Sequence, residues 1–108
     1  MNKKIEGYWY SKYHKQYPMP IPNQLTDKEA SAICMLIKMK EKEAKVRIYK
    51  GWSNSRITGE KLGCREFETE HWIWPSDFTE HYVHKHKVKP TDAFLKYIGY
   101  NDIKIKGN

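Results

Sequence analysis

The chain has 108 residues, a formal net charge of +7 and 39% hydrophobic residues, and it contains four Trp, eight Tyr and three Phe. This length supports one hydrophobic core, so we expect a single domain over residues 1–108, and the apolar and aromatic content excludes a disordered chain. The longest apolar run, residues 32–37, is far shorter than the roughly 18 residues that a membrane helix needs.

The sequence predicts a cytosolic protein without a membrane partner. Its charged start, residues 1–4, leads into no apolar segment of the kind that a secretion signal contains. Two cysteines are too few for a disulfide scaffold, so both are expected to be reduced thiols. Cys34 lies in the apolar run and is expected in the core, whereas Cys64 follows Gly63 in an expected turn.

The positive charge is unevenly distributed. Residues 1–54 carry eleven Lys or Arg against five Asp or Glu, and residues 55–108 carry nine against eight. Between Glu60 and Glu80 there are six acidic and two basic residues. The isoelectric point near 9.4 permits attraction to nucleic acid or to an acidic protein, but the acidic band argues against a uniformly basic groove.

In chain order, the first recognisable segment covers residues 8–23. Aromatic rings stand at positions 8, 9, 10, 13 and 17, and prolines follow at 18, 20 and 22. Proline at every second position removes backbone donors and fixes φ, so residues 17–23 must be extended and cannot form an interior strand. We expect residues 8–23 to form an aromatic, proline-rich strap over the domain; a polyproline ligand is the alternative.

A longer helix follows. Thr26 and Glu29 have the spacing of a capping box, which predicts the start of the helix. Apolar residues then recur at helical spacing and predict one buried face, and the helix is expected to end near Lys45. Its expected buried residues are Ala30, Ile33, Cys34 and Ile37.

Short strands are predicted next. Residues 45–52 read as a strand with Val46 and Ile48 on one face, and glycines at 51, 59 and 63 separate further strands. Residues 66–74 alternate with a period of two and predict one continuous strand, with Trp72 and Trp74 on the face that also carries Glu66, Glu68 and Glu70.

Two short helices are predicted to complete the chain. Pro75 ends the strand, and a helix from residue 76 or 77 is expected to carry Phe78, His81, Tyr82 and Lys85 on one side. Another begins at residue 90 or 91 and stops at Gly99, and the tail predicts a short edge strand. The fold class is therefore α+β: one longer helix in the N-terminal half, a central antiparallel sheet of short strands and two short C-terminal helices.

Several motifs occur together, namely YKG at 49–51, SRITG at 55–59, EF at 66–67, WIWP at 72–75, HY at 81–82 and VKP at 88–90. With the opening GYWYS and PMPIPN segments, this pattern resembles a family of small cytosolic proteins of bacteria and phages. The resemblance covers nearly the whole chain and implies a compact fold, but no particular activity. Some members of the family that this pattern resembles have two cysteines around the SRITG element. In this chain Ser55 and Thr58 occupy these positions, so the resemblance implies no metal site.

A metal site has few candidates. Cys64, His81 and His84 are possible zinc ligands, and the two histidines are spaced by about one helical turn. Zinc needs about four such ligands in tetrahedral geometry, and the chain has neither a C-x-x-C nor an H-E-x-x-H motif. His84 also lies in a lysine-rich run. We therefore expect no metal and no other cofactor.

For acid–base catalysis, the candidates are His71, His81 and Glu80. The chain contains no nucleophile elbow, phosphate-binding glycine loop or dinucleotide fingerprint. A small enzyme with a histidine and a carboxylate is therefore the second alternative.

A binding module that acts on a protein partner, of the inhibitor, immunity or adaptor type, is the favoured prediction, and Trp52 and Tyr100 are the expected exposed rings. Nucleic-acid binding is the first alternative. It would use basic side chains to contact phosphates, and the candidates are Arg47, Lys50, Lys85, Lys87 and Lys89. Only three of the twenty basic residues are arginines, and no nucleic-acid-binding motif is present.

Overall fold

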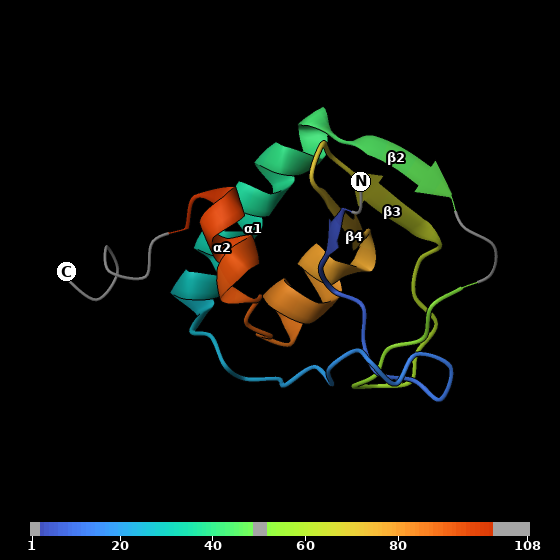
Figure 1. Cartoon of the computed structure of the whole chain (residues 1–108). Helices are drawn as coiled ribbons and strands as arrows, with labels where there is room; N and C mark the ends of the chain where they lie inside the picture. The colour runs from blue at the N-terminus through green and yellow to red at the C-terminus, as the bar shows by residue number, and fades with distance from the viewer. Residues whose placement is uncertain (1–2, 49–51, 101–108) are drawn as a thin grey trace.

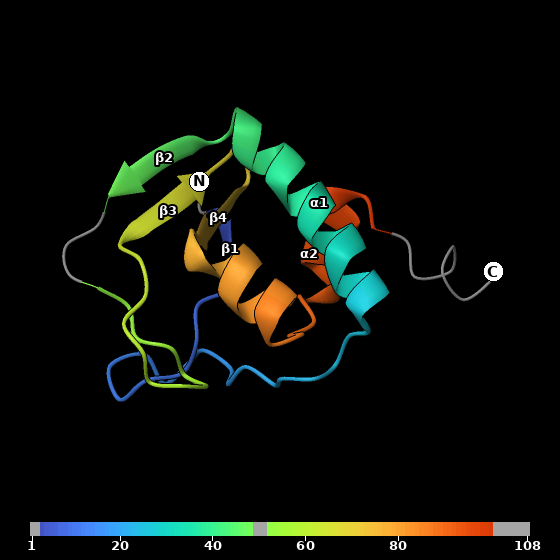
Figure 2. The ribbon, with the colours of Figure 1, turned by 180° about the vertical axis from the view of Figure 1, so that it is seen from behind.

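The structure, a computed structural model, describes residues 3–48 and 52–100 and combines a four-stranded sheet with three helices packed beside it (Figures 1 and 2). The α+β class, with its longer first helix and two short C-terminal helices, is confirmed. In chain order the elements are β1 (Lys4–Ile5), α1 (Asp27–Glu43), β2 (Lys45–Ile48), β3 (Arg65–Glu68), β4 (Trp72–Pro75), η1 (Phe78–Lys85) and α2 (Asp92–Ile98). Within the described ranges, no helix is both long and apolar enough to span a membrane.

The sheet has the order β1-β4-β3-β2 and is mixed. Neighbouring strands from β2 to β4 are antiparallel, as predicted, but β1 pairs with β4 in parallel. The backbone N–H of Lys4 donates to the carbonyl of His71 at 2.9 Å, and that of Glu6 to Ile73 at 3.0 Å. The sequence did not predict β1, because a strand of two residues shows no alternation and depends on its partner.

The prediction of one strand over residues 66–74 is wrong, because the chain reverses between Glu68 and Trp72 to form β3 and β4. Thr69 closes this turn: its N–H donates to the carbonyl of Trp72 at 2.9 Å, and its hydroxyl accepts from the N–H of Trp72 at 3.3 Å. No glycine or proline marks the turn. The reversal pairs Phe67 with Trp74, and the two rings lie 6.0 Å apart.

The predicted start of α1 is confirmed. The N–H of Glu29 donates to the Thr26 hydroxyl at 3.1 Å, and the Glu29 carboxylate accepts from the N–H of Thr26 at 2.9 Å. This reciprocal pair satisfies two backbone donors at the first turn. The predicted face of α1 is buried, and the helix ends at Glu43, slightly before the expected position.

The second predicted helix is present as η1, a π-helix. Its wider i→i+5 turn brings five side chains of eight residues into the interior, namely Phe78, Thr79, His81, Tyr82 and Val83. Lys85 is exposed rather than on the buried side, and His84 is exposed while His81 is buried. His86 is half-buried, and its ring lies 4.7 Å from that of His81.

Residues 8–23 contain no helix and no strand, only an isolated bridge between Ser11 and His14. In Figure 2 this segment runs below η1 toward the start of α1. Trp9 packs against the core, with its ring 6.3 Å from Phe78 and 5.3 Å from Tyr82. Tyr13 is 78% exposed, so the rings of this segment are divided between the interior and the surface.

The third helix, α2, has the predicted ends. The Thr91 hydroxyl accepts from the N–H of Phe94 at 3.3 Å, and Gly99 ends the helix with a φ of +87°. Glu6 fixes this helix to the N-terminal segment, because its carboxylate accepts from both the N–H and the hydroxyl of Thr91, at 2.7 and 2.8 Å. The predicted edge strand of the tail lies outside the described residues.

Candidate functional site

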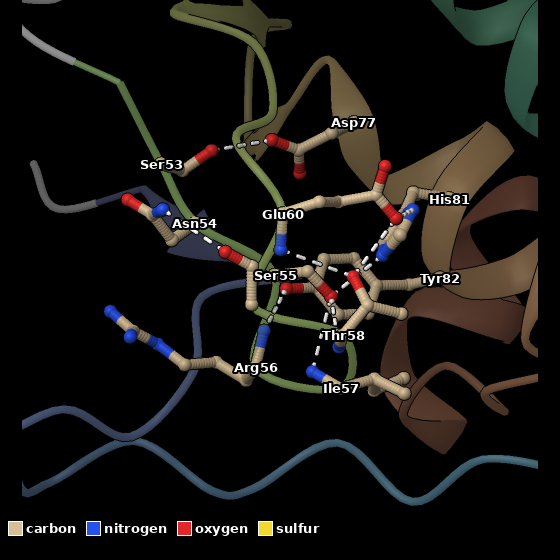
Figure 3. Close-up of polar contacts among 11 residues, drawn as sticks. Ser53, Asn54, Ser55, Arg56, Ile57, Thr58, Glu60, Asp77, His81 and Tyr82 are labelled. Atoms are coloured by element: carbon tan, nitrogen blue, oxygen red, sulfur yellow. Dashed lines mark hydrogen bonds and ion pairs between the residues drawn. The ribbon is translucent and has the colours of Figure 1, made fainter.

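Residues 53–63 form a loop that closes on itself beside η1 (Figure 3). The N–H of Ser55 donates to the carbonyl of Glu60 at 2.8 Å, and the N–H of Gly59 donates back to Ser55 at 2.9 Å. Nearer the base, the N–H of Leu62 donates to Ser53 at 2.7 Å. These bonds give the loop a defined shape without regular strands.

Ser55 joins the loop to η1. Its side chain is buried, at 3% exposure, and its Oγ accepts from the N–H groups of Ile57 and Thr58 at 3.1 and 3.0 Å. The same oxygen lies 2.7 Å from Nε2 of His81. Because two donors already point at Oγ, the Ser55 hydroxyl hydrogen is directed to His81, which assigns the proton of the neutral imidazole to Nδ1.

The surroundings of His81 favour the neutral imidazole. Burial lowers the pKa of His81, and the neighbouring His86 and Lys85 lower it further, whereas the carboxylates of Glu60 and Asp77 act in the opposite direction. Nδ1 of His81 lies 3.9 Å from the Glu60 carboxylate, which is too long for a hydrogen bond. The histidine is therefore an acceptor for Ser55.

Serine, histidine and glutamate are the residue types of a nucleophilic triad. Here, however, the serine is buried, its oxygen is occupied by two backbone donors, and the carboxylate does not reach the imidazole. A nucleophile must instead present a free oxygen to the substrate. The arrangement of Ser55, His81 and Glu60 therefore fixes the loop on η1 rather than exposing a reactive hydroxyl.

Acidification is expected to destabilise the fold through His81. An unfolded histidine has a pKa near 6.5 and burial lowers that value in the folded state, so the unfolded chain takes up the proton first. The stabilising contribution is complete above pH 6.5 and is lost as the pH falls through the lower folded pKa. Denaturant unfolding between pH 7.5 and 5.5 measures this loss.

The matched control for this experiment is the exposed neighbour His84 on the same helix. His84→Asn should keep the acid-dependent loss of unfolding free energy, whereas His81→Asn should flatten the pH profile. Equal profiles for wild type and His81→Asn would show that another group titrates. Burial raises the pKa of Glu6 and of Asp77, so these groups change stability in the opposite sense.

A pocket of about 270 Å³ lies between the N-terminal segment and the base of the 53–63 loop. We call it the aromatic pocket, because four Tyr and Trp rings line it, those of Tyr8, Trp9, Tyr17 and Tyr82, beside the imidazole of His14. The Tyr8 hydroxyl donates to Glu66 at 2.6 Å, and the Tyr82 hydroxyl accepts from the N–H of Arg56 at 3.1 Å. Two of the four rings are thus held by hydrogen bonds at their hydroxyl ends.

Among the described residues that line the aromatic pocket, Asp77 has the only carboxylate. It accepts from the Ser53 hydroxyl at 2.6 Å. Within residues 3–48 and 52–100, no Lys, Arg or His nitrogen lies within 4.0 Å of it. Burial raises the pKa of Asp77, and the hydrogen bond from Ser53 and the charge of His81 oppose this shift.

A second pocket of about 280 Å³ lies on the other side of Tyr8 and Trp9. We call it the apolar pocket; Ile5, Met19, Ile21 and Val88 are among its lining residues. Gly7, Tyr8, Trp9 and Tyr17 line both pockets. The two hollows therefore adjoin. We call the surface of residues 5–21 around them the N-terminal face; its exposed apolar side chains are those of Ile5, Tyr10, Tyr13, Met19 and Ile21.

The three residues proposed for catalysis lie in different surroundings. His71 is exposed in the turn between β3 and β4, and its Nε2 is 3.7 Å from the Glu70 carboxylate. Glu80 is exposed on η1, where it pairs with Lys38. His81 is buried, and in the described part of the chain no hydrogen bond or ion pair joins any two of these residues.

The weak metal candidates Cys64, His81 and His84 form no site: across the two described ranges, no three His, Cys, Asp or Glu side chains are grouped so as to hold a metal ion. Cys34 is buried and Cys64 is half-buried, and both are free thiols. Burial raises the pKa of Cys34 to about 11, which makes its thiol unreactive at neutral pH.

Of the two predicted binding rings, Trp52 is 58% exposed and Lys61 Nζ lies 4.1 Å from its centroid. Tyr100 is only half-exposed because it packs against the core, so it does not provide the expected exposed ring. The prediction treated the end of α2 as surface, but the chain folds back there: the N–H of Tyr100 donates to Leu95 at 2.9 Å.

The predicted basic residues do not form one surface of free charges. Arg47 lies 3.2 Å from the Glu68 carboxylate and 3.9 Å from that of Glu66. Lys87 donates to the carbonyl of His84 and lies 3.4 Å from Asp27. Lys85 and Lys89 are exposed, and Lys50 lies outside the described residues.

Sequence reasoning did not select Asp77 or the rings of the aromatic pocket as a site. Asp77 follows Pro75 at the expected start of a helix and was therefore read as a helix-start residue, yet its side chain makes no capping bond to η1. Tyr8, Trp9 and Tyr17 belong to the predicted strap, and Tyr82 to the predicted second helix. Only the three-dimensional structure brings residues 8–17 to residues 53–56 and 77–82.

Comparison of the chain with protein-family models, with curated proteins and with solved structures finds no match. The resemblance to small proteins of bacteria and phages therefore stays a prediction.

Proposed function

We propose that the protein is a non-enzymatic binding module that docks on a protein partner through its N-terminal face. One observation carries the proposal. Of the ten large hydrophobic side chains that are exposed in the described residues, five come from residues 5–21, although that stretch is a small part of the chain. Concentrated exposed apolar side chains are typical of interaction surfaces.

The shape and composition of this face support the same function. Interface hot spots are rich in aromatic rings that fill pockets, and the N-terminal face offers both Tyr13 and two adjoining hollows. Lys12 and Lys15 are exposed in the same segment, and Lys89 lines the apolar pocket. With a net charge of +7, these lysines favour a partner surface that carries acidic as well as apolar side chains. The two free thiols support a cytosolic location for this encounter.

The proposal is tested by capture of partners from nuclease-treated native lysate with tagged protein. Tyr13→Ser combined with Ile21→Ser should reduce capture at least about tenfold, because both side chains are exposed at an anchor-rich surface. The matched control is Met35→Ser combined with Ile48→Ser, which removes two equally exposed apolar side chains, 65% and 73% exposed, from α1 and β2.

Each result bears on the proposal. A partner that is lost with the first double variant and kept with the control supports it. A partner that survives the first double variant contradicts it. Nucleic acid captured without nuclease, with binding that falls steeply with salt, would favour the nucleic-acid alternative instead.

A further inference from the structure

Within residues 3–48 and 52–100, no cationic side chain pairs with the Asp77 carboxylate. It is half-buried, its hydrogen-bond donors in the described residues are the neutral hydroxyl of Ser53 and the backbone N–H of Gly63, and it neither caps η1 nor pairs with a cation there. A buried carboxylate is costly unless an opposite charge compensates it. An incoming cation would supply that compensation.

The walls of the aromatic pocket suit a cation too. The faces of Tyr and Trp rings attract cations by their quadrupole, most strongly where water is excluded. The ring of Trp9 lies 5.3 Å from that of Tyr82, and the ring of Tyr8 lies 6.1 Å from that of Tyr17. Packing and hydrogen bonds hold these rings in place before any ligand arrives, which lowers the entropy cost of binding.

Among the described residues, the basic side chains that line the pocket, Arg56 and His14, form no ion pair with Asp77. Arg56 lines the same pocket, but Figure 3 shows its guanidinium extending away from Asp77. His81 affects Asp77 electrostatically but makes its hydrogen bond to Ser55. The volume of about 270 Å³ is below that of a typical drug-sized pocket, so a single side-chain-sized group fits better than a large ligand.

From this combination of one uncompensated carboxylate and four aromatic walls, we infer that the aromatic pocket binds an organic ammonium group, either a methylated amine or the amine of a lysine side chain. The ammonium group lies against the rings and faces Asp77. The inference deepens the proposed function, since a lysine presented by the docked partner is one source of this group; a free small amine is the other.

The first test compares choline with 3,3-dimethyl-1-butanol, which has the same shape without the positive charge. Each is titrated into the full-length protein, and binding is followed by the NMR shift of the Trp9 indole N–H. Choline should bind with a dissociation constant of roughly 10 mM or below, and the neutral analogue at least about tenfold more weakly. Equal binding of the two, or no binding of choline, would overturn the inference.

Two variants locate the site. Asp77→Asn keeps an acceptor for Ser53 and removes only the charge, so the protein should fold normally and bind choline about tenfold more weakly. Tyr17→Leu keeps an apolar side chain and removes one aromatic face, so affinity should fall about threefold or more. The control Asp92→Asn removes an exposed carboxylate of α2 outside the pocket and should leave affinity unchanged. Wild-type affinity in folded Asp77→Asn would refute the assignment.

The source of the amine is distinguished by a second pair of probes. An N-acetyl-lysine-methylamide, with its free side-chain amine, models a partner's lysine, and its side-chain-acetylated form is the neutral control. Stronger binding of the lysine probe than of choline assigns the site to a partner, and the reverse assigns it to a small amine. Because these titrations use purified protein alone, they can fail while the capture experiment succeeds, and the reverse also holds.

Discussion

Replacing Trp74 by alanine should lower the free energy of unfolding by about 3–5 kcal/mol, the range for a buried large aromatic side chain. Trp74 is fully buried, and its ring lies 5.4 Å from Phe94 and 6.0 Å from Phe67. Its indole N–H also donates to the Glu41 carboxylate at 3.0 Å. Truncation removes apolar contacts on both sides of the core and leaves a cavity.

The hydrogen bond contributes to the same effect. The Glu41 carboxylate oxygen that accepts from Trp74 also accepts from the Thr79 hydroxyl at 2.7 Å. Trp74→Ala therefore leaves a half-buried carboxylate with one donor fewer, while Trp74→Phe keeps most of the packing and should be less damaging.

The control is Trp52→Ala, which removes an exposed indole. Its effect should stay within about 0.5 kcal/mol, as is usual for surface substitutions. Denaturant unfolding followed by far-ultraviolet circular dichroism measures all three variants. A similar loss for Trp52→Ala and Trp74→Ala would contradict the assignment of Trp74 to the core.

Gly7→Ala should have the second large effect, a loss of about 2–5 kcal/mol. Gly7 has a φ of +79°, which costs a residue with a side chain about 1–2 kcal/mol. A Cβ at this position would also lie 2.6 Å from Cδ1 of the fully buried Phe78. Overpacking of this kind typically costs a further 1–3 kcal/mol, approximately.

Gly59→Ala separates the two contributions. Gly59 has almost the same φ, +80°, but no atom lies within 4 Å of the position that its Cβ would take. It should therefore lose only about 1–2 kcal/mol, from the backbone strain alone. Equal losses for the two alanine variants, again by denaturant unfolding, would show that Gly7 does not approach Phe78 closely.

The sequence predicts those elements whose signals are local. The capping box at Thr26 and Glu29 and the apolar spacing that follows it identify α1, and Thr91 and Gly99 bound α2. Each of these signals depends on residues within a few positions of one another, so a single sequence contains all the information that they need.

Elements defined by distant partners were missed. The pairing of Lys4 with Trp72 exists only in the folded chain, and the reversal after Glu68 uses the Thr69 side chain instead of a glycine or proline. The π-helical turn of η1 likewise leaves Lys85 exposed, although the sequence placed it on the same side as Phe78, His81 and Tyr82. In each case tertiary packing, rather than local preference, decided the conformation.

The candidate site was unpredictable for the same reason. The aromatic pocket gathers Tyr8 and Tyr17 from one segment, Ser53 and Arg56 from a loop, and Asp77 next to η1. Residue types alone favoured a binding protein, but the rings that sequence reasoning expected at the surface were Trp52 and Tyr100. Trp52 is exposed as predicted and Tyr100 is not, whereas five of the ten exposed large hydrophobic side chains of the described residues lie in residues 5–21.

The bonds between Glu6 and Thr91 span 85 positions of the chain. Contacts of such large sequence separation slow folding, because loop closure must precede the gain from the contact. During synthesis, at about 5–20 residues per second, Thr91 leaves the ribosome roughly ten seconds after Glu6. During that interval the aromatic segment that follows Glu6 lacks the helix that anchors it in the folded protein. The nascent chain would therefore expose this segment to chaperones.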